Sequence, residues 1–107
     1  MHRGEVVHLR SQRGLRGHEQ RGSRFAVVVQ TNALLAISTV IVAPTSTRGR
    51  PTSFRPQVEI DGQHTVVMID HIASVDLSRI GESVRMLTWG EQMDIDRALK
   101  LVLGLAS

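Results

Sequence analysis

The feature that most constrains the fold of this chain is a series of short apolar segments, followed by a single helical pattern at the C-terminal end. Short runs rich in Val, Ile and Thr and bounded by turn residues are typical of β-strands. We expect strands at Glu5–Leu9, Phe25–Gln30, Thr39–Ala43, Gln57–Ile60, Thr65–Ile69, Ile72–Val75 and Ser83–Leu87, with Gly81 between the last two. Many short strands and one terminal helix predict a mainly β fold, a small barrel with a helical appendage.

Loop and turn residues separate these segments. Residues 10–23 are rich in Arg, Gly and Gln, and they predict a long loop. We expect Pro44 to end the strand before it, because proline cannot donate to a β-ladder, and we expect a polar loop over residues 45–53. The Asp61-Gly62 pair is a strong signal for a tight β-hairpin.

The helical pattern begins at a capping box, with Thr88 as N-cap and Glu91 three residues later. Gly104 is a glycine of the kind that ends helices in a left-handed conformation. Two adjacent faces are apolar, the first formed by Ile95, Leu99 and Val102 and the second by Ala98, Leu101 and Leu105. So broad an apolar surface predicts packing on the sheet and a symmetric homodimer that uses the helix or adjacent strands. We expect Trp89 and Phe25 in the core.

Composition limits the class of protein. A chain of 107 residues suits one domain, residues 1–107. It has no cysteine, which excludes a disulfide framework and a thiolate metal site. The N-terminal stretch has no long apolar run that would predict a signal peptide or a membrane span, so we expect a cytoplasmic protein without membrane contact.

Charge is distributed unevenly along the chain. Through Pro56 there are nine arginines against two glutamates, a net charge of +7, whereas the remainder has four basic and eight acidic residues, a net charge of −4. Arginines concentrated in loops suit a polyanionic ligand such as nucleic acid. A solvated arginine-rich surface would have the same composition, so charge alone does not decide between the two.

Four motifs occur in order along the chain. The first is Arg3-Gly4-Glu5-Val6, and the second is G-x-E-Q-x-G at residues 17–22, followed by Arg24. The third is Ala43-Pro44 followed by a hydroxyl run, and the fourth is the segment from Val66 to Val84, VVMIDHIASVDLSRIGESV. Together with the terminal DRALKLVLGL, this series resembles the MazF/PemK family of toxin endoribonucleases from bacterial toxin–antitoxin pairs. The chain departs from the family at Phe25, where a proline is usual, and at the hydroxyl run, which is one residue short.

The resemblance implies an SH3-like β-barrel with a C-terminal helix that cuts single-stranded RNA without a metal or other cofactor. The ribose 2′-oxygen would attack the adjacent phosphate. Arg24 corresponds to the family's functional arginine, and we assign it phosphate binding and transition-state stabilisation, because a guanidinium with a pKa above about 12 is a poor base. The functional hydroxyl is Thr45 if the letters are matched and Ser46 if residues are counted from the strand. Alternation along a strand predicts that only one of them faces the site.

The same resemblance implies an RNA-binding surface and a protein partner. The expected RNA-binding residues flank the catalytic pair in the two loops: Arg16, His18, Glu19, Gln20, Arg21, Thr47, Arg48 and Arg50. The expected partner is a cognate MazE-like antitoxin with an acidic inhibitory segment. No spacing of His, Asp or Glu in the chain reads as a metal site.

Three alternatives stay open. Histidines His8, His18, His64 and His71 are other candidates for acid–base catalysis. A second class of function is a CcdB-like toxin that binds gyrase, which has the same fold but depends on a tryptophan close to the C-terminus, whereas Trp89 begins the helix. A third is a non-catalytic barrel-type binding module.

Overall fold

Seven strands and one α-helix make up the regular structure in the computed structural model, which describes residues 1–10, 24–34 and 38–105. The strands are β1 (Glu5–Leu9), β2 (Phe25–Val28), β3 (Thr39–Ser46), β4 (Gln57–Ile60), β5 (Gln63–Val67), β6 (Ala73–Asp76) and β7 (Ile80–Met86). The helix α1 (Trp89–Leu103) follows, and short 3₁₀ turns lie at η2 (Asn32–Leu34), η3 (Ile69–His71) and η4 (Leu77–Arg79). The prediction of a mainly β fold with a C-terminal helix is confirmed.

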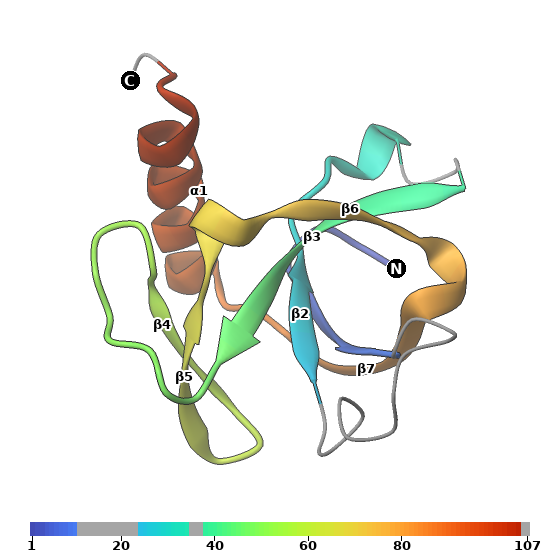
Figure 1. Ribbon diagram of the computed structural model, residues 1–107, viewed down its shortest axis with the longest axis horizontal. Helices are drawn as coiled ribbons and strands as arrows, with labels where there is room; N and C mark the ends of the chain where they lie inside the picture. The colour runs from blue at the N-terminus through green and yellow to red at the C-terminus, as the bar shows by residue number, and fades with distance from the viewer. Residues whose placement is uncertain (11–23, 35–37, 106–107) are drawn as a thin grey trace.

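All strand pairs are antiparallel, in the order β4-β5-β3-β2-β1-β7, with β6 also paired to β3. The sheet curls strongly, so that β4 and β5 lie at one end, close to α1, and β1, β2 and β7 form the wall at the other (Figure 1). Figure 1 therefore shows a half-barrel with the helix set beside its open side.

The prediction that Pro44 ends its strand is wrong, because β3 continues to Ser46. Before Pro44 the strand pairs with β6, and after it the strand pairs with β5 through Thr45 and Ser46. Within one strand residue the N–H and C=O point to the same side. The Pro44 carbonyl accepts from the Met68 N–H at 2.8 Å, so the missing donor faces the junction between β5 and β6, where the ladder is already interrupted.

Other boundaries also differ from expectation. The strand predicted to reach Gln30 ends at Val28, and the strand predicted to reach Ile69 ends at Val67. Ile69 instead begins the turn η3 and is fully buried, so it serves as a core residue between β5 and β6. Gly81 does not separate two strands but lies within β7, where a Cβ would approach the His8 backbone of β1.

Two valine-rich clusters form the core, one on each face of the central strands. The larger contains Val6, Val27 and Val67 together with Ile95 and Ala98 of α1. The smaller contains side chains that point the other way from β1, β2, β3 and β6: Val7, Ala26, Val28, Val40, Val42 and Val75. Because β1 and β2 are buried on both faces, they form a rigid base for the loop residues at the ends of these strands.

The helix begins at the predicted capping box, in which Thr88 accepts from the Glu91 N–H and Glu91 accepts from the Thr88 N–H. It ends at Gly104, whose φ of 69° favours glycine. Expected core packing of Trp89 is wrong: the side chain is 79% exposed, since it starts the helix on the side opposite Ile95 and Ala98. None of the helices in the described segments is long and apolar enough to span a membrane.

Candidate functional site

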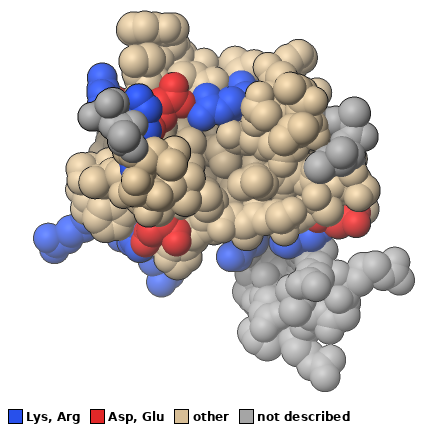
Figure 2. Space-filling model, turned by 90° about the horizontal axis from the view of Figure 1, so that it is seen from above, with Lys and Arg blue, Asp and Glu red and all other residues tan. Residues whose placement is uncertain are grey.

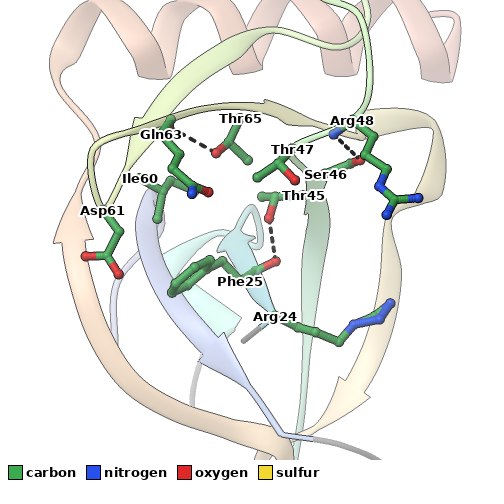
Figure 3. A pocket seen from close by; sticks show the side chains of 10 residues that line it. All are labelled: Arg24, Phe25, Thr45, Ser46, Thr47, Arg48, Ile60, Asp61, Gln63 and Thr65. Carbon is green, nitrogen blue, oxygen red and sulfur yellow. Dashed lines mark hydrogen bonds between the residues drawn. The ribbon is translucent and has the colours of Figure 1, made fainter. Parts of the chain in front are cut away.

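A cleft of about 820 Å³ opens where β2 begins, where β3 ends and at the β4–β5 hairpin. Figure 3 shows the side chains that line it, which come from two walls. The strand-end wall consists of Arg24, Phe25, Thr45, Ser46, Thr47 and Arg48. The hairpin wall consists of Ile60, Asp61, Gln63 and Thr65.

The strand-end wall is held together by hydrogen bonds to the backbone carbonyls at the start of β2. The Arg24 carbonyl accepts from the Leu9 N–H of β1 at 2.9 Å. The Phe25 carbonyl accepts from the Thr45 hydroxyl at 2.9 Å, which joins the start of β2 to the end of β3 (Figure 3). Arg24 is therefore anchored through its backbone while its exposed side chain lies in the cleft.

Thr45 and Ser46 both line the cleft, so strand alternation does not separate them. Their hydroxyls differ in hydrogen bonding instead. The Thr45 proton is donated to the Phe25 carbonyl, which leaves its oxygen as an acceptor toward a ligand. The Ser46 oxygen accepts from the Arg48 N–H at 3.1 Å, which leaves its proton to be donated. The Thr45 oxygen can thus accept from a donor group of a substrate, and the Ser46 hydroxyl can donate to an oxyanion.

Two guanidinium groups lie on this wall. Figure 3 shows the Arg24 and Arg48 side chains on the same side of the cleft, with the Arg48 guanidinium directed toward that of Arg24. Among the ion pairs of the described segments, neither residue takes part. Two planar cations at one edge of a cleft suit a phosphate group, whose oxygens they can grip bidentately.

Other arginines of the basic half are used by the fold itself. Arg3 donates to the Asp96 carboxylate at 2.8 Å and to the Val29 carbonyl at 2.9 Å. Arg10 donates to two carbonyls beside β7. Arg55 makes a bidentate pair with Asp70 at 3.0 and 2.7 Å, which lowers the pKa of that carboxyl. Viewed from above, the basic side chains lie apart rather than in one patch (Figure 2).

The predicted RNA-binding residues have different fates. Thr47 and Arg48 line the cleft beside the candidate catalytic residues. Arg50 is exposed but is not part of the lining. Arg16, His18, Glu19, Gln20 and Arg21 lie outside the described residues.

Sequence reasoning missed the hairpin wall. The turn signal at Asp61-Gly62 predicts a backbone conformation only, whereas Asp61, Gln63 and Thr65 all line the same cleft as Arg24. Alternation along β5 carries a partial signal, since Gln63 and Thr65 are two residues apart and share one face. What brings that face to Arg24 is the pairing of β5 with the end of β3.

The alternative acid–base residues lie elsewhere. His8 packs on the Phe25 ring at 4.8 Å between centroids, and His64 contacts the Gln57 amide at 2.7 Å. His71 lies beside Asp70. Of the histidines that the structure describes, none lines the cleft. No group of three or more potential metal-ligating side chains gathers within the described segments either.

Comparison with known proteins identifies a family and relatives that the whole chain resembles. The family model for the "PemK-like, MazF-like toxin of type II toxin-antitoxin system" matches residues 2–103. A Mycobacterium tuberculosis protein named "Putative toxin Rv3098A/RVBD_3098A" is 36% identical over 104 residues, which cover 96% of this chain and 97% of the relative. The "Endoribonuclease MazF" of Staphylococcus epidermidis is 29% identical over 110 residues, which cover 96% of this chain and 91% of that protein.

A solved structure has the same fold. The "Endoribonuclease in complex with its cognate antitoxin from Mycobacterial species" superposes with a TM-score of 0.80, covering 100% of this chain and 98% of that chain. Sequence identity in this comparison is 20%, so the likeness establishes the fold.

Proposed function

This chain belongs to the family of PemK-like, MazF-like toxins of type II toxin–antitoxin systems, and from that premise we propose that it is an endoribonuclease that cuts single-stranded RNA without a metal ion. Cleavage of messenger RNA would then inhibit translation and growth. The observation that carries the proposal is the joint lining of one cleft by Arg24, Arg48 and the hydroxyls of Thr45 and Ser46.

In the proposed reaction the ribose 2′-oxygen loses its proton and attacks the adjacent phosphorus. The bond from phosphorus to the 5′-oxygen breaks, and that oxygen takes up a proton. The products are a 2′,3′-cyclic phosphate and a 5′-hydroxyl. Two protons therefore have to be moved, and the negative charge that grows on the phosphoryl oxygens has to be stabilised.

Each residue of the strand-end wall has chemistry that fits one of these tasks. Arg24 and Arg48 bind the phosphate and stabilise the crowded transition state, because a guanidinium donates from two nitrogens in a fixed plane. The Ser46 hydroxyl can donate to a phosphoryl oxygen, and the Thr45 oxygen can accept from the 2′-hydroxyl. Both hydroxyls stand in position through contacts to backbone atoms, so their orientation does not depend on the substrate.

The test is direct incubation of the purified chain with a long RNA in excess EDTA. We expect fragments with defined ends, and we expect the downstream fragments to carry 5′-hydroxyls that a polynucleotide kinase can phosphorylate without prior phosphatase treatment. Arg24→Ala prepared in parallel controls for contaminating nucleases. RNA that stays intact in EDTA and is cut only after Mg²⁺ is restored would overturn the metal-free mechanism.

Membership of the family also suggests a protein partner for this chain. A solved mycobacterial endoribonuclease is in complex with its cognate antitoxin, and we propose that a MazE-like antitoxin silences this chain by occupying the cleft. An acidic segment that is disordered when free would meet Arg24 and Arg48 and would associate fast and with strong salt dependence. We place the encounter in the cytoplasm, where messenger RNA is available.

We also propose a symmetric homodimer. Trp89, Leu101, Leu103 and Leu105 are each more than half exposed in the single chain. Large apolar side chains exposed along a helix are more stable when a second subunit covers them. Light scattering at micromolar concentration should give twice the chain mass, and a monomeric mass would contradict the proposal.

A further inference from the structure

The two walls of the cleft differ in charge, and this difference suggests that they contact different parts of a ligand. The strand-end wall carries both cations, Arg24 and Arg48, whereas the hairpin wall carries one carboxylate, Asp61, and one amide, Gln63. A carboxylate repels the phosphate groups of RNA. Its presence in a cleft for a polyanion therefore needs a reason other than phosphate binding.

The hairpin turn does not supply that reason. Asp61 has a φ of 54° and Gly62 a φ of 78°, as the two central residues of a type I′ turn require. Asparagine adopts this conformation at least as readily as aspartate, so the turn demands the backbone but not the negative charge. Asp61 is exposed, and its carboxylate has no hydrogen-bond or ion-pair partner within the segments that the structure describes.

The strand-end wall also carries an aromatic ring, that of Phe25. Figure 3 shows Phe25 between Asp61 on one side and Arg24 on the other, with the Gln63 amide directed into the cleft. The ring is partly buried, packs against the larger core cluster and lies 4.8 Å from the His8 ring between centroids. A nucleotide with its phosphate at Arg24 could rest its base on this ring, since aromatic side chains are the usual stacking surface for single-stranded RNA. The edge of that base would then face the hairpin.

We propose that the β4–β5 hairpin reads a base of the bound RNA, and that Asp61 selects a base whose edge presents N–H donors and rejects uracil. The proposal rests on RNA being the substrate. A carboxylate only accepts hydrogen bonds. Guanine offers it two adjacent donors, and adenine and cytosine each offer an amino group. Uracil offers one N–H between two carbonyl oxygens, which repel the carboxylate. Gln63, with donors and an acceptor, adds a second contact.

The experiment maps cleavage ends on a long RNA of mixed sequence for the parent chain, Asp61→Asn and Glu59→Gln. In the parent we expect one position near the cut to be depleted of uracil. In Asp61→Asn, cleavage at sites with uracil there should rise by about tenfold relative to the other sites, the scale of one good base-reading contact. Glu59→Gln removes the same charge from the same hairpin outside the lining, and its map should match the parent.

A second measurement uses the parent protein alone. A short RNA that contains the selected base is compared with one in which the analogue without the exocyclic amino group replaces it, for example inosine for guanosine. Cleavage of the analogue should be about tenfold slower. An unchanged rate, or identical maps for the parent and Asp61→Asn, would overturn the proposal while leaving RNA cleavage intact. A parent chain that cuts no RNA would instead overturn the proposed function.

Discussion

Among the arginines of the N-terminal half that the structure describes, two groups look alike in the sequence but differ in the structure. The fold arginines, Arg3, Arg10 and Arg55, donate to carboxylates and carbonyls of other elements. The cleft arginines, Arg24 and Arg48, lie beside hydroxyl groups in a cleft. A guanidinium whose donors are already taken stabilises the fold but offers little to a phosphate. The lesson is that a basic half of a chain is not by itself a binding surface, because much of its charge can be consumed internally.

The largest effect on RNA cleavage is expected from replacing Arg24, one of the two cleft arginines. Arg24→Ala should lower RNA cleavage by about 10³-fold or more, because the transition-state charge loses a preorganised donor. The free energy of unfolding should stay close to that of the parent, since the side chain packs against little. Arg24→Lys should recover little activity, because a point charge lacks the planar fork. Cleavage rates and urea unfolding measure the two properties separately.

The matched control for Arg24→Ala is Arg55→Ala, which removes a fold arginine. It should cut RNA at about the parental rate and should unfold at a lower urea concentration, because Asp70 loses its bidentate partner. If Arg24→Ala instead cuts RNA at the parental rate, Arg24 has no role in cleavage and the division between cleft and fold arginines fails.

The next largest effect concerns the two hydroxyl residues of the strand-end wall. Thr45→Ala and Ser46→Ala should differ, with one losing about 10²-fold in rate, the scale of a lost proton-transfer or oxyanion group. Thr45→Ala should also loosen the link to the Phe25 carbonyl, whereas Ser46→Ala should not. Thermal unfolding of both variants separates that structural part from the chemical one. Equal and mild losses of rate would direct attention to a histidine outside the described residues.

A smaller effect concerns the edge of the cleft and the antitoxin. Arg48→Glu should weaken binding of a non-cleavable RNA analogue by about tenfold or more, the effect of exchanging attraction for repulsion at one contact. Binding of the antitoxin should weaken in parallel, because we propose that both ligands use the same wall. Arg50→Glu, outside the lining, should have a weaker effect on both. A titration in which RNA and antitoxin bind together without loss of affinity would exclude inhibition by occupancy of the cleft.

The smallest effect is on stability as a function of pH. Arg55 holds the pKa of Asp70 below its usual value of 3.8 by direct hydrogen bonding. The contribution of the pair is therefore fully present above pH 3.8 and is lost as the pH falls through the lowered pKa. Asp70→Asn should unfold more easily than the parent at neutral pH, and the difference should vanish in strong acid. A difference that stays constant across this range would show that the ion pair is not its cause.

Sequence reasoning was most successful where the signal is local. The capping box at Thr88, the hairpin at Asp61-Gly62 and the strand at Glu5–Leu9 follow from neighbouring residues, and the structure contains all three. Prediction from the sequence failed where contacts between residues far apart in the chain determine the local structure. Pro44 stays within β3 because two different strands meet at the point where its donor is missing, and no property of residues near Pro44 reveals that junction.

The same distinction holds for the candidate site. Arg24 and the hydroxyls after Pro44 could be identified from motifs, since the motif letters lie close together in the chain. Asp61 and Gln63 could not be, because they reach the cleft only through the register of β5 on β3, where Val67 lies opposite Thr45. The sequence also leaves open which of Thr45 and Ser46 acts, and in the structure the two hydroxyls differ in the direction of their hydrogen bonds.

By itself the sequence determined the class of fold, the single terminal helix with its cap and end, and the residue types from which a phosphate site could be built. Tertiary structure alone decided which arginines remain in a cleft, that a carboxylate from a hairpin lines the same cleft, and that Trp89 and Leu101 stay exposed. The physical reason is the range of the interactions. Capping, turns and periodicity act over a few residues, whereas a site is made by strand pairing that joins residues far apart in the chain.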